Sequence, residues 1–138
     1  MKNNKQLLSE NLEWAKETFK VENFSFEGTM DAGIAAIFAA AIDNKATNVV
    51  AEKFVYSLNL VETRFVSEAA SFALVVQDIL KYADISTAIA LLEGKVTLIS
   101  PLHGDNTPIT EDEKTNFVKL IFDENRKFEL NNLELEVE

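Results

Sequence analysis

The chain contains no cysteine, a single histidine and only two arginines among its 138 residues. Without cysteine it cannot form a disulfide framework, an iron–sulfur site, a thiolate zinc site or a cysteine nucleophile. A histidine-based metal site would need a second good ligand at helical or hairpin spacing, and none accompanies His103. Most groups that titrate or attack near neutral pH are therefore missing. We expect no catalytic residues, no metal and no cofactor.

Glycine and proline are also scarce, with four and two residues. The glycines are isolated, so the sequence has no glycine-rich phosphate-binding loop. Neither Ser25 nor Ser100 lies in the G-x-S-x-G frame of a serine nucleophile. The enzymatic alternative is a hydrolase that uses carboxylates, or His103 as a general base oriented by Asp105 in an expected surface loop.

Long hydrophobic runs are absent as well. The longest apolar run covers residues 32–42, whereas a helix needs about 20 residues to cross a bilayer. The N-terminal residues lead into an amphipathic stretch with several glutamates rather than into the apolar core of a signal peptide. We expect a cytoplasmic protein that does not bind a membrane.

What the chain has in excess is negative charge, with a net charge of −10. Residues 105–138 hold 10 acidic and 4 basic residues, so the imbalance is greatest in the C-terminal quarter. Such a surface repels phosphate backbones, and we expect no direct binding to nucleic acid. The 11 lysines and 12 asparagines are typical of AT-rich bacterial or phage genomes, and a phage origin is one hypothesis.

Length and composition predict one globular domain over residues 1–138. Apolar side chains at the spacing of one helical face predict a helix over residues 4–20. Phe24 and Phe26 alternate with polar residues, which predicts a short strand over residues 21–27. The next helix, which ends near Asp43, is apolar nearly all round and should be buried.

The segment from residue 50 to residue 83 predicts one long central helix, with two nearly collinear helices that meet near residues 63–67 as the alternative. Its apolar residues recur with a mean spacing of about 3.67 residues, although residues 54–60 alone alternate like a strand. Tyr56, Leu60 and Leu74 lie off the main stripe and form a second apolar face. A helix of this length would span about 50 Å at 1.5 Å per residue, more than a compact domain of this size accommodates. The overhang favours packing against another copy.

The C-terminal part predicts shorter elements. Residues 85–93 suit either a short helix or one arm of a hairpin, and residues 95–100 suit a strand. Thr110 to Glu113 form a capping box that starts a helix ending near Asp123. A two-residue turn at Asn131 and Asn132 predicts a terminal hairpin, with a single bulged strand as the alternative.

Together these elements predict an α+β fold that is mainly helical, with one long central amphipathic helix and a small antiparallel sheet that includes a C-terminal hairpin. The function we expect is that of a non-catalytic interaction protein, such as an assembly factor, an adaptor or an inhibitor. Its expected partners are a second copy of itself and another protein. A small-ligand-binding protein, with a pocket between helices or at an oligomer seam, is the first alternative, and a carboxylate- or His103-dependent enzyme is the second.

Two surfaces are candidates for these contacts. The expected self-association interface consists of Ala35, Ala36, Ala39, Ala40, Tyr56, Leu60 and Leu74. The expected acidic face toward a basic partner consists of Glu129, Glu134, Glu136 and Glu138. The alternative for the acidic face is a charged sheet edge that merely prevents aggregation.

Overall fold

The computed structural model describes residues 4–43, 46–59 and 78–138. Four parallel strands form one sheet in the order β1-β2-β3-β4: β1 (Phe24–Thr29), β2 (Ala46–Glu52), β3 (Gly94–Ile99) and β4 (Leu133–Val137). The helices are α1 (Asn4–Phe19), α2 (Asp31–Asp43), α3 (Ile85–Ala90) and α4 (Glu111–Lys127), with a 3₁₀ turn, η2 (Ile79–Lys81), before α3. The fold is therefore α/β.

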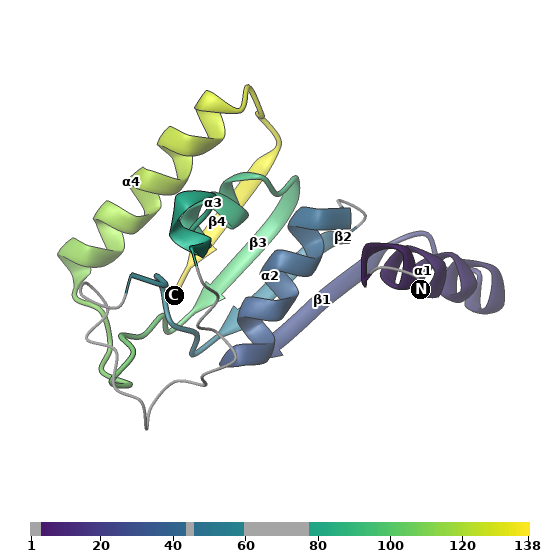
Figure 1. Cartoon of the computed structure of the whole chain (residues 1–138), viewed down its shortest axis with the longest axis horizontal. Coiled ribbons are helices and arrows are strands. Elements are labelled where there is room, and N and C mark those ends of the chain that lie inside the picture. Colours follow the sequence, from purple (N-terminus) through teal and green to yellow (C-terminus); the bar gives the residue numbers. More distant parts are fainter. Residues whose placement is uncertain (1–3, 44–45, 60–77) are drawn as a thin grey trace.

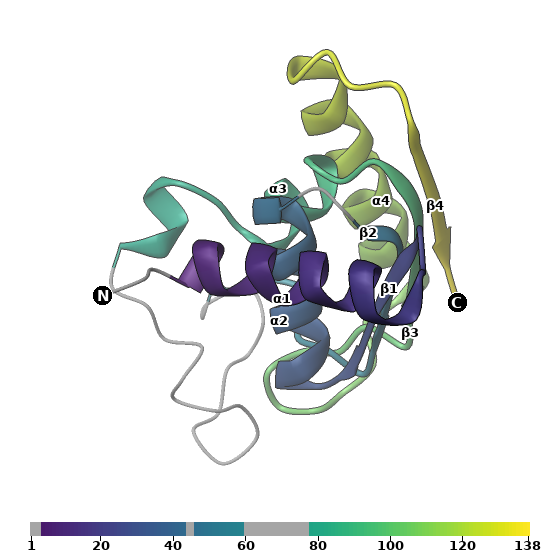
Figure 2. The same cartoon turned by 90° about the vertical axis from the view of Figure 1, so that its right-hand side faces the viewer.

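The helices α2, α3 and α4 lie on one face of the sheet (Figures 1 and 2). Each strand pairs with the next one along the chain, so every crossover moves in the same direction across the sheet. Right-handed crossovers in one direction place all their helices on the same side. The helix α1 lies beyond β1 and packs against α2 (Figure 1). Within the described part of the chain, no helix covers the other face of the sheet.

The strands are adapted to this two-layer arrangement because their residues alternate in burial. In β3, Val96 and Leu98 are fully buried beneath the helices, whereas Lys95 is exposed on the open face. In β1 and β4 the partly buried and exposed residues also alternate strictly. The core lies between the sheet and α2, α3 and α4, with Ile37 and Ile121 among its fully buried side chains. All-parallel sheets usually have both faces covered, so the open polar face is unusual.

The prediction of a mainly helical α+β fold with an antiparallel sheet is wrong. Residues 46–52 form the second strand of the sheet, and Phe54 is buried in the loop that follows it. The predicted central helix over residues 50–83 thus begins in a strand, and residues 79–81 form only a 3₁₀ turn. Residues 60–77 lie outside the described residues. Among the described residues that showed the helical spacing, Val50 lies in β2, Phe54 is buried in the loop after it, and Leu80 in the 3₁₀ turn is 49% exposed, so they do not share one helical face.

The predicted C-terminal hairpin is also wrong. Phe128 and Leu130 follow the end of α4 without forming a strand, and residues 133–137 pair in parallel with β3. Glu129 has a positive φ of 58°, and the Leu130 N–H donates to the Asn125 carbonyl. These contacts turn the chain back from α4 toward the sheet. The local alternation identified β4 correctly, but its partner is distant in the sequence.

Several other predictions are confirmed. The structure contains the first two helices, the strand at Phe24 and Phe26, and the strand β3 within three residues of the expected bounds. Residues 85–90 are helical, which decides the ambiguity over residues 85–93. The capping box of Thr110 and Glu113 starts α4, which extends four residues beyond the expected end at Asp123, to Lys127.

Candidate functional site

The carboxyl ends of the four strands meet at one edge of the sheet, where ligands bind in open α/β folds. The residue that follows each of the first three strands has a positive φ: 57° at Met30, 50° at Lys53 and 49° at Ser100. The N–H of Met30 donates to the Glu52 carbonyl, and the N–H of Lys53 donates to the Ile99 carbonyl. Each strand end is therefore bonded to the end of the next strand.

The turn from β1 to α2 is the tightest of these connections. It consists of Met30 alone, because β1 ends at Thr29 and α2 begins at Asp31. A Cβ added to Gly28 would lie 2.3 Å from the backbone of Ala32, and one added to Gly33 would lie 2.9 Å from the Gly28 carbonyl oxygen. Only glycine allows the strand and the helix to approach this closely.

This local geometry is that of a nucleophile elbow, in which a strained residue projects from a sharp strand-to-helix turn. The apex here is Met30, whose side chain is about half exposed. A thioether has no proton to give up and cannot form an acyl intermediate. The G-x-S-x-G pattern does not identify this turn, because Met30 occupies the position of the serine and Ala32 occupies the position of the second glycine.

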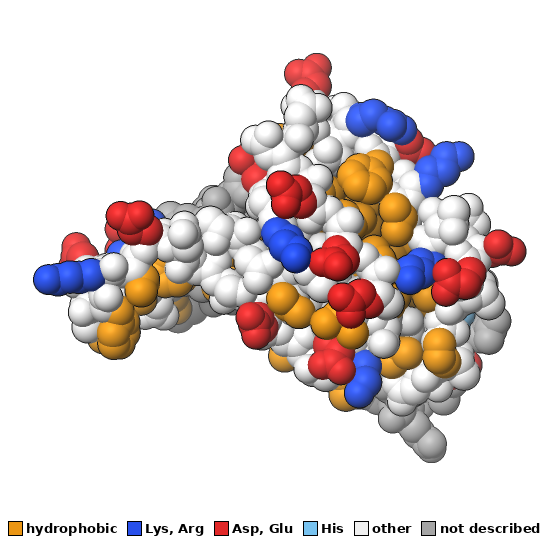
Figure 3. Space-filling view, turned by 180° about the vertical axis from the view of Figure 1, so that it is seen from behind, with side chains coloured by type: hydrophobic (Ala, Val, Ile, Leu, Met, Phe, Trp, Pro, Cys, Tyr) orange, Lys and Arg blue, Asp and Glu red, His pale blue; other side chains and the backbone are white. Residues whose placement is uncertain are grey.

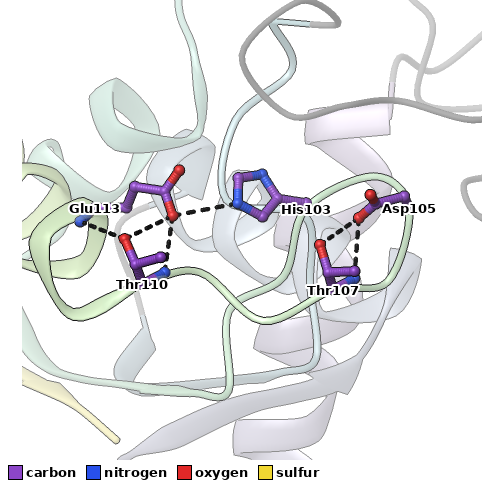
Figure 4. Close-up of polar contacts among 5 residues, drawn as sticks. All are labelled: His103, Asp105, Thr107, Thr110 and Glu113. Carbon is purple, nitrogen blue, oxygen red and sulfur yellow. Dashed lines mark hydrogen bonds and ion pairs between the residues drawn. The ribbon is translucent and has the colours of Figure 1, made fainter.

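The first polar cluster of this edge is the contact between His103 and Glu113 (Figure 4). His103 follows β3 and is 1% exposed, and its Nε2 lies 3.3 Å from Oε2 of Glu113. The same oxygen accepts hydrogen bonds from the backbone N–H of Thr110 at 2.8 Å and from its hydroxyl at 2.9 Å. These bonds to Thr110 lower the pKa of Glu113 below its ordinary value of 4.5, against a smaller opposing effect of burial, and His103 lowers it further.

The expectation that His103 lies in a surface loop beside Asp105 is wrong. Asp105 accepts hydrogen bonds from the N–H and the hydroxyl of Thr107, and it closes the loop (Figure 4). The ring of His103 packs edge-on against Tyr56, which packs in the same way against Phe117. An ionised carboxylate only accepts, so Nε2–H donates to Glu113. Among the described residues, no group hydrogen-bonds to the opposite nitrogen, Nδ1.

We expect Thr110→Ala to lower the free energy of unfolding by about 1 kcal/mol at pH 7, because the hydroxyl accepts from the Glu113 N–H at 3.3 Å. The hydroxyl also donates to the Glu113 carboxylate. A lowered pKa means that this second contribution is complete above pH 4.5 and is lost as the pH falls through the lowered value. Urea unfolding at several pH values should therefore show a smaller cost in acid. Thr115→Ala, further along α4, is the matched control, and an equal loss from both variants would contradict the cap.

Asp84 organises the second polar cluster. Its Oδ1 accepts from the N–H groups of Leu58 and Ile85 at 2.7 Å each, and its Oδ2 accepts from the hydroxyl of Ser57. The carboxylate thus caps α3 and holds the loop after β2 against it. Ser57 uses its proton in this bond, and no histidine hydrogen-bonds to its oxygen in the described residues. The bond between Ser57 and Asp84 therefore stabilises the fold and does not activate Ser57 as a nucleophile.

Between these two polar clusters lies a shallow pocket with a volume of about 240 Å³. It is lined by Tyr56, Ser57, Asp84, Ser86, Glu113, Asn116, Phe117 and Leu120. Drug-sized ligands usually occupy pockets of about 300–1,000 Å³. The pocket is therefore large enough for one side chain or a very small molecule. No group of three or more His, Cys, Asp or Glu side chains in the described residues is arranged to hold a metal.

The structure places the expected interface residues in different environments. Ala36 and Ala40 are buried in the core, Ala39 is partly buried, and Ala35 is exposed on α2. Tyr56 is partly buried beside His103. The other two members, Leu60 and Leu74, lie outside the described residues.

The expected acidic residues mostly gather at one edge of the sheet. Glu134 and Glu136 are exposed on the open face of β4, and Glu138 follows at its carboxyl end. Glu129 is exposed at the end of α4 and is not part of the strand. Three of the four residues therefore form a row along β4.

No protein-family model matches the sequence, and no curated protein or solved structure is significantly similar to it. None of the helices in the described ranges combines the length and apolar composition needed to cross a membrane.

Proposed function

We propose that the chain is a non-catalytic protein-interaction domain that associates with a second copy of itself through α1. The observation that carries this proposal is the exposed apolar surface of that helix. Trp14 is 59% exposed and Phe19 is 63% exposed, and their rings contact each other at a centroid distance of 5.6 Å. Leu7 is 45% exposed, whereas Leu12 is buried.

The position of α1 strengthens this argument. The helix has 16 residues and lies beyond the edge of the sheet, where it packs against α2 (Figures 1 and 2). Isolated helices of about this length are marginally stable in water, so α1 needs an apolar partner surface. A second copy offers the same surface, and two-fold association is the commonest form of homo-oligomer. Burial of the two aromatic rings is favourable by about 25 cal/mol per Å² of apolar area.

The carboxyl edge gives little support to a catalytic function. The apex of the β1–α2 turn is methionine, and the hydroxyl of Ser57 is bound to Asp84. Glu113, whose pKa is lowered, is a weaker general base than an ordinary glutamate. Thr110 with Glu113 and Asp84 cap helices, and Asp105 closes a loop, so these polar side chains have structural roles. A role as assembly factor, adaptor or inhibitor agrees better with these features than acyl transfer does.

The protein at tens of micromolar is expected to have the mass of a dimer in light scattering. Trp14→Glu combined with Phe19→Glu should convert it to a monomer, since the substitutions place like charges across the proposed interface. Tyr82→Glu, at a side chain that is 82% exposed, is the matched control and should leave the dimer intact.

A monomeric mass for the unmodified protein would overturn self-association. A dimer that survives the double substitution would move the interface away from α1, and Ala35 on α2 would be tested next. Circular dichroism of each variant verifies that the fold is retained.

A further inference from the structure

The strand β4 forms an open edge of the sheet. It pairs with β3 on one side, and no strand of the described residues pairs with its other side. The Glu138 N–H donates to Leu98, and its carbonyl accepts from Ser100. Because backbone groups alternate in direction along a strand, Leu133, Leu135 and Val137 direct their N–H and C=O groups outward.

A groove with both apolar and polar lining residues runs beside this edge. It lies between β4 and the first half of α4, has a volume of about 310 Å³, and is lined by Glu111, Lys114, Thr115, Val118, Leu135 and Val137. Figure 3 shows hydrophobic side chains between these two elements, with acidic side chains of the open sheet face beside them. A strand added to β4 would direct every second side chain into this groove.

The remaining side chains of such a strand would face the row of acidic residues. Glu134 and Glu136 point to the open face. Glu136 forms an ion pair with Lys95 at the surface, in which both side chains are about half exposed. Exposed pairs of this kind contribute about 0–1 kcal/mol and are easily exchanged. A second copy of β4 would place glutamates beside glutamates, which is unfavourable. The charges therefore select a basic occupant over a second copy.

We propose that the edge of β4 and the groove beside it bind an extended peptide segment in which apolar residues alternate with lysine or arginine. Main-chain hydrogen bonds to Leu133, Leu135 and Val137 supply affinity, as in other cases of strand addition. The apolar side chains enter the groove, and the basic side chains face Glu134 and Glu136. This site extends the proposed interaction function to a second surface and does not depend on α1.

A fluorescein-labelled seven-residue peptide of alternating valine and lysine is the probe, and its anisotropy on titration with the full chain measures binding. We expect saturable binding that weakens as salt rises. A peptide of the same composition with its lysines grouped at one end should bind at least tenfold more weakly. Equal binding of the two peptides would overturn the proposal, because it would reveal attraction to negative charge alone.

Three variants locate the site. Val137→Pro removes an outward N–H without removing a bond to β3. This variant should bind the alternating peptide at least tenfold more weakly. The double variant Glu134→Gln with Glu136→Gln should bind the alternating peptide more weakly and with a smaller salt dependence. The control Glu129→Gln, outside the strand, should leave both the affinity and its salt dependence unchanged.

Unchanged binding by Val137→Pro would overturn strand addition. A change in the mass of the free protein on Val137→Pro would show that a second copy occupies the edge, which also overturns the proposal. The α1 variant that removes self-association should bind the peptide normally, so the two proposals fail separately.

Discussion

Gly28→Ala is expected to lower the free energy of unfolding by about 3 kcal/mol. The added Cβ would lie 2.3 Å from the carbonyl carbon and oxygen of Ala32, and these backbone atoms belong to the first turn of α2. The overlap is relieved only if α2 moves away from β1, which would open the core around Ile34 and Ile37. Urea unfolding monitored by circular dichroism measures the loss.

The control is Thr29→Ala at the exposed neighbouring position, which should change the stability by less than about 0.5 kcal/mol. A loss below about 1 kcal/mol in Gly28→Ala would contradict the tight turn, since it would show that the strand and helix separate easily. If Gly28→Ala is unfolded at every temperature tested, the fold requires this tight turn.

Asp84→Ala should be nearly as damaging, with an expected loss of about 3 kcal/mol. The substitution removes the acceptor of Ser57, Leu58 and Ile85 at once. It leaves two backbone N–H groups without their partner, and it frees the loop after β2 from α3. Thermal and urea unfolding of the variant measure the effect.

The comparison that isolates the cap is Asp84→Asn. Asparagine retains an oxygen for the helix N-terminus, so this variant should recover at least half of the loss. Equal destabilisation by alanine and asparagine would show that the negative charge, rather than the cap, holds the loop.

Several helices and strands could be predicted from sequence because their signals are local. The alternation around Phe24 and the capping box at Thr110 depend on residues that are close in the chain, and both predictions are confirmed. The pairing of β4 with β3 depends on a register between Leu133 and Gly94, which no local pattern contains. The predicted hairpin failed for this reason.

The central helix failed because a single spacing was extended over several elements. Val49 and Ala51 are buried in β2, and Phe54 continues the core in a loop. The predicted helical spacing instead started at Val50, which is only partly buried, and Leu80 near its other end is 49% exposed. The alternation over residues 54–60 begins just after β2 ends at Glu52, and the carbonyl of Phe54 accepts a hydrogen bond from the Leu102 N–H.

The candidate site was predicted in part. His103 was recognised as the chain's only histidine, but its partner is Glu113, ten residues later, because the loop turns the ring inward. The sequence does indicate the turn at Met30 through two glycines, Gly28 and Gly33, which lie on either side of the end of β1. Only the structure shows that both are required by the approach of two backbones.

The order β1-β2-β3-β4 has a consequence for how the protein is made. Each strand adds to the edge left by the strand before it, so a chain leaving the ribosome can complete each strand–helix–strand unit without waiting for its C-terminus. The connection from Glu52 to Gly94 is the longest between successive strands, and we expect its closure to be the slowest step of folding. In the order β1-β2-β3-β4 the outermost strand on one side is therefore the acidic strand β4, and its glutamates oppose pairing with a second β4.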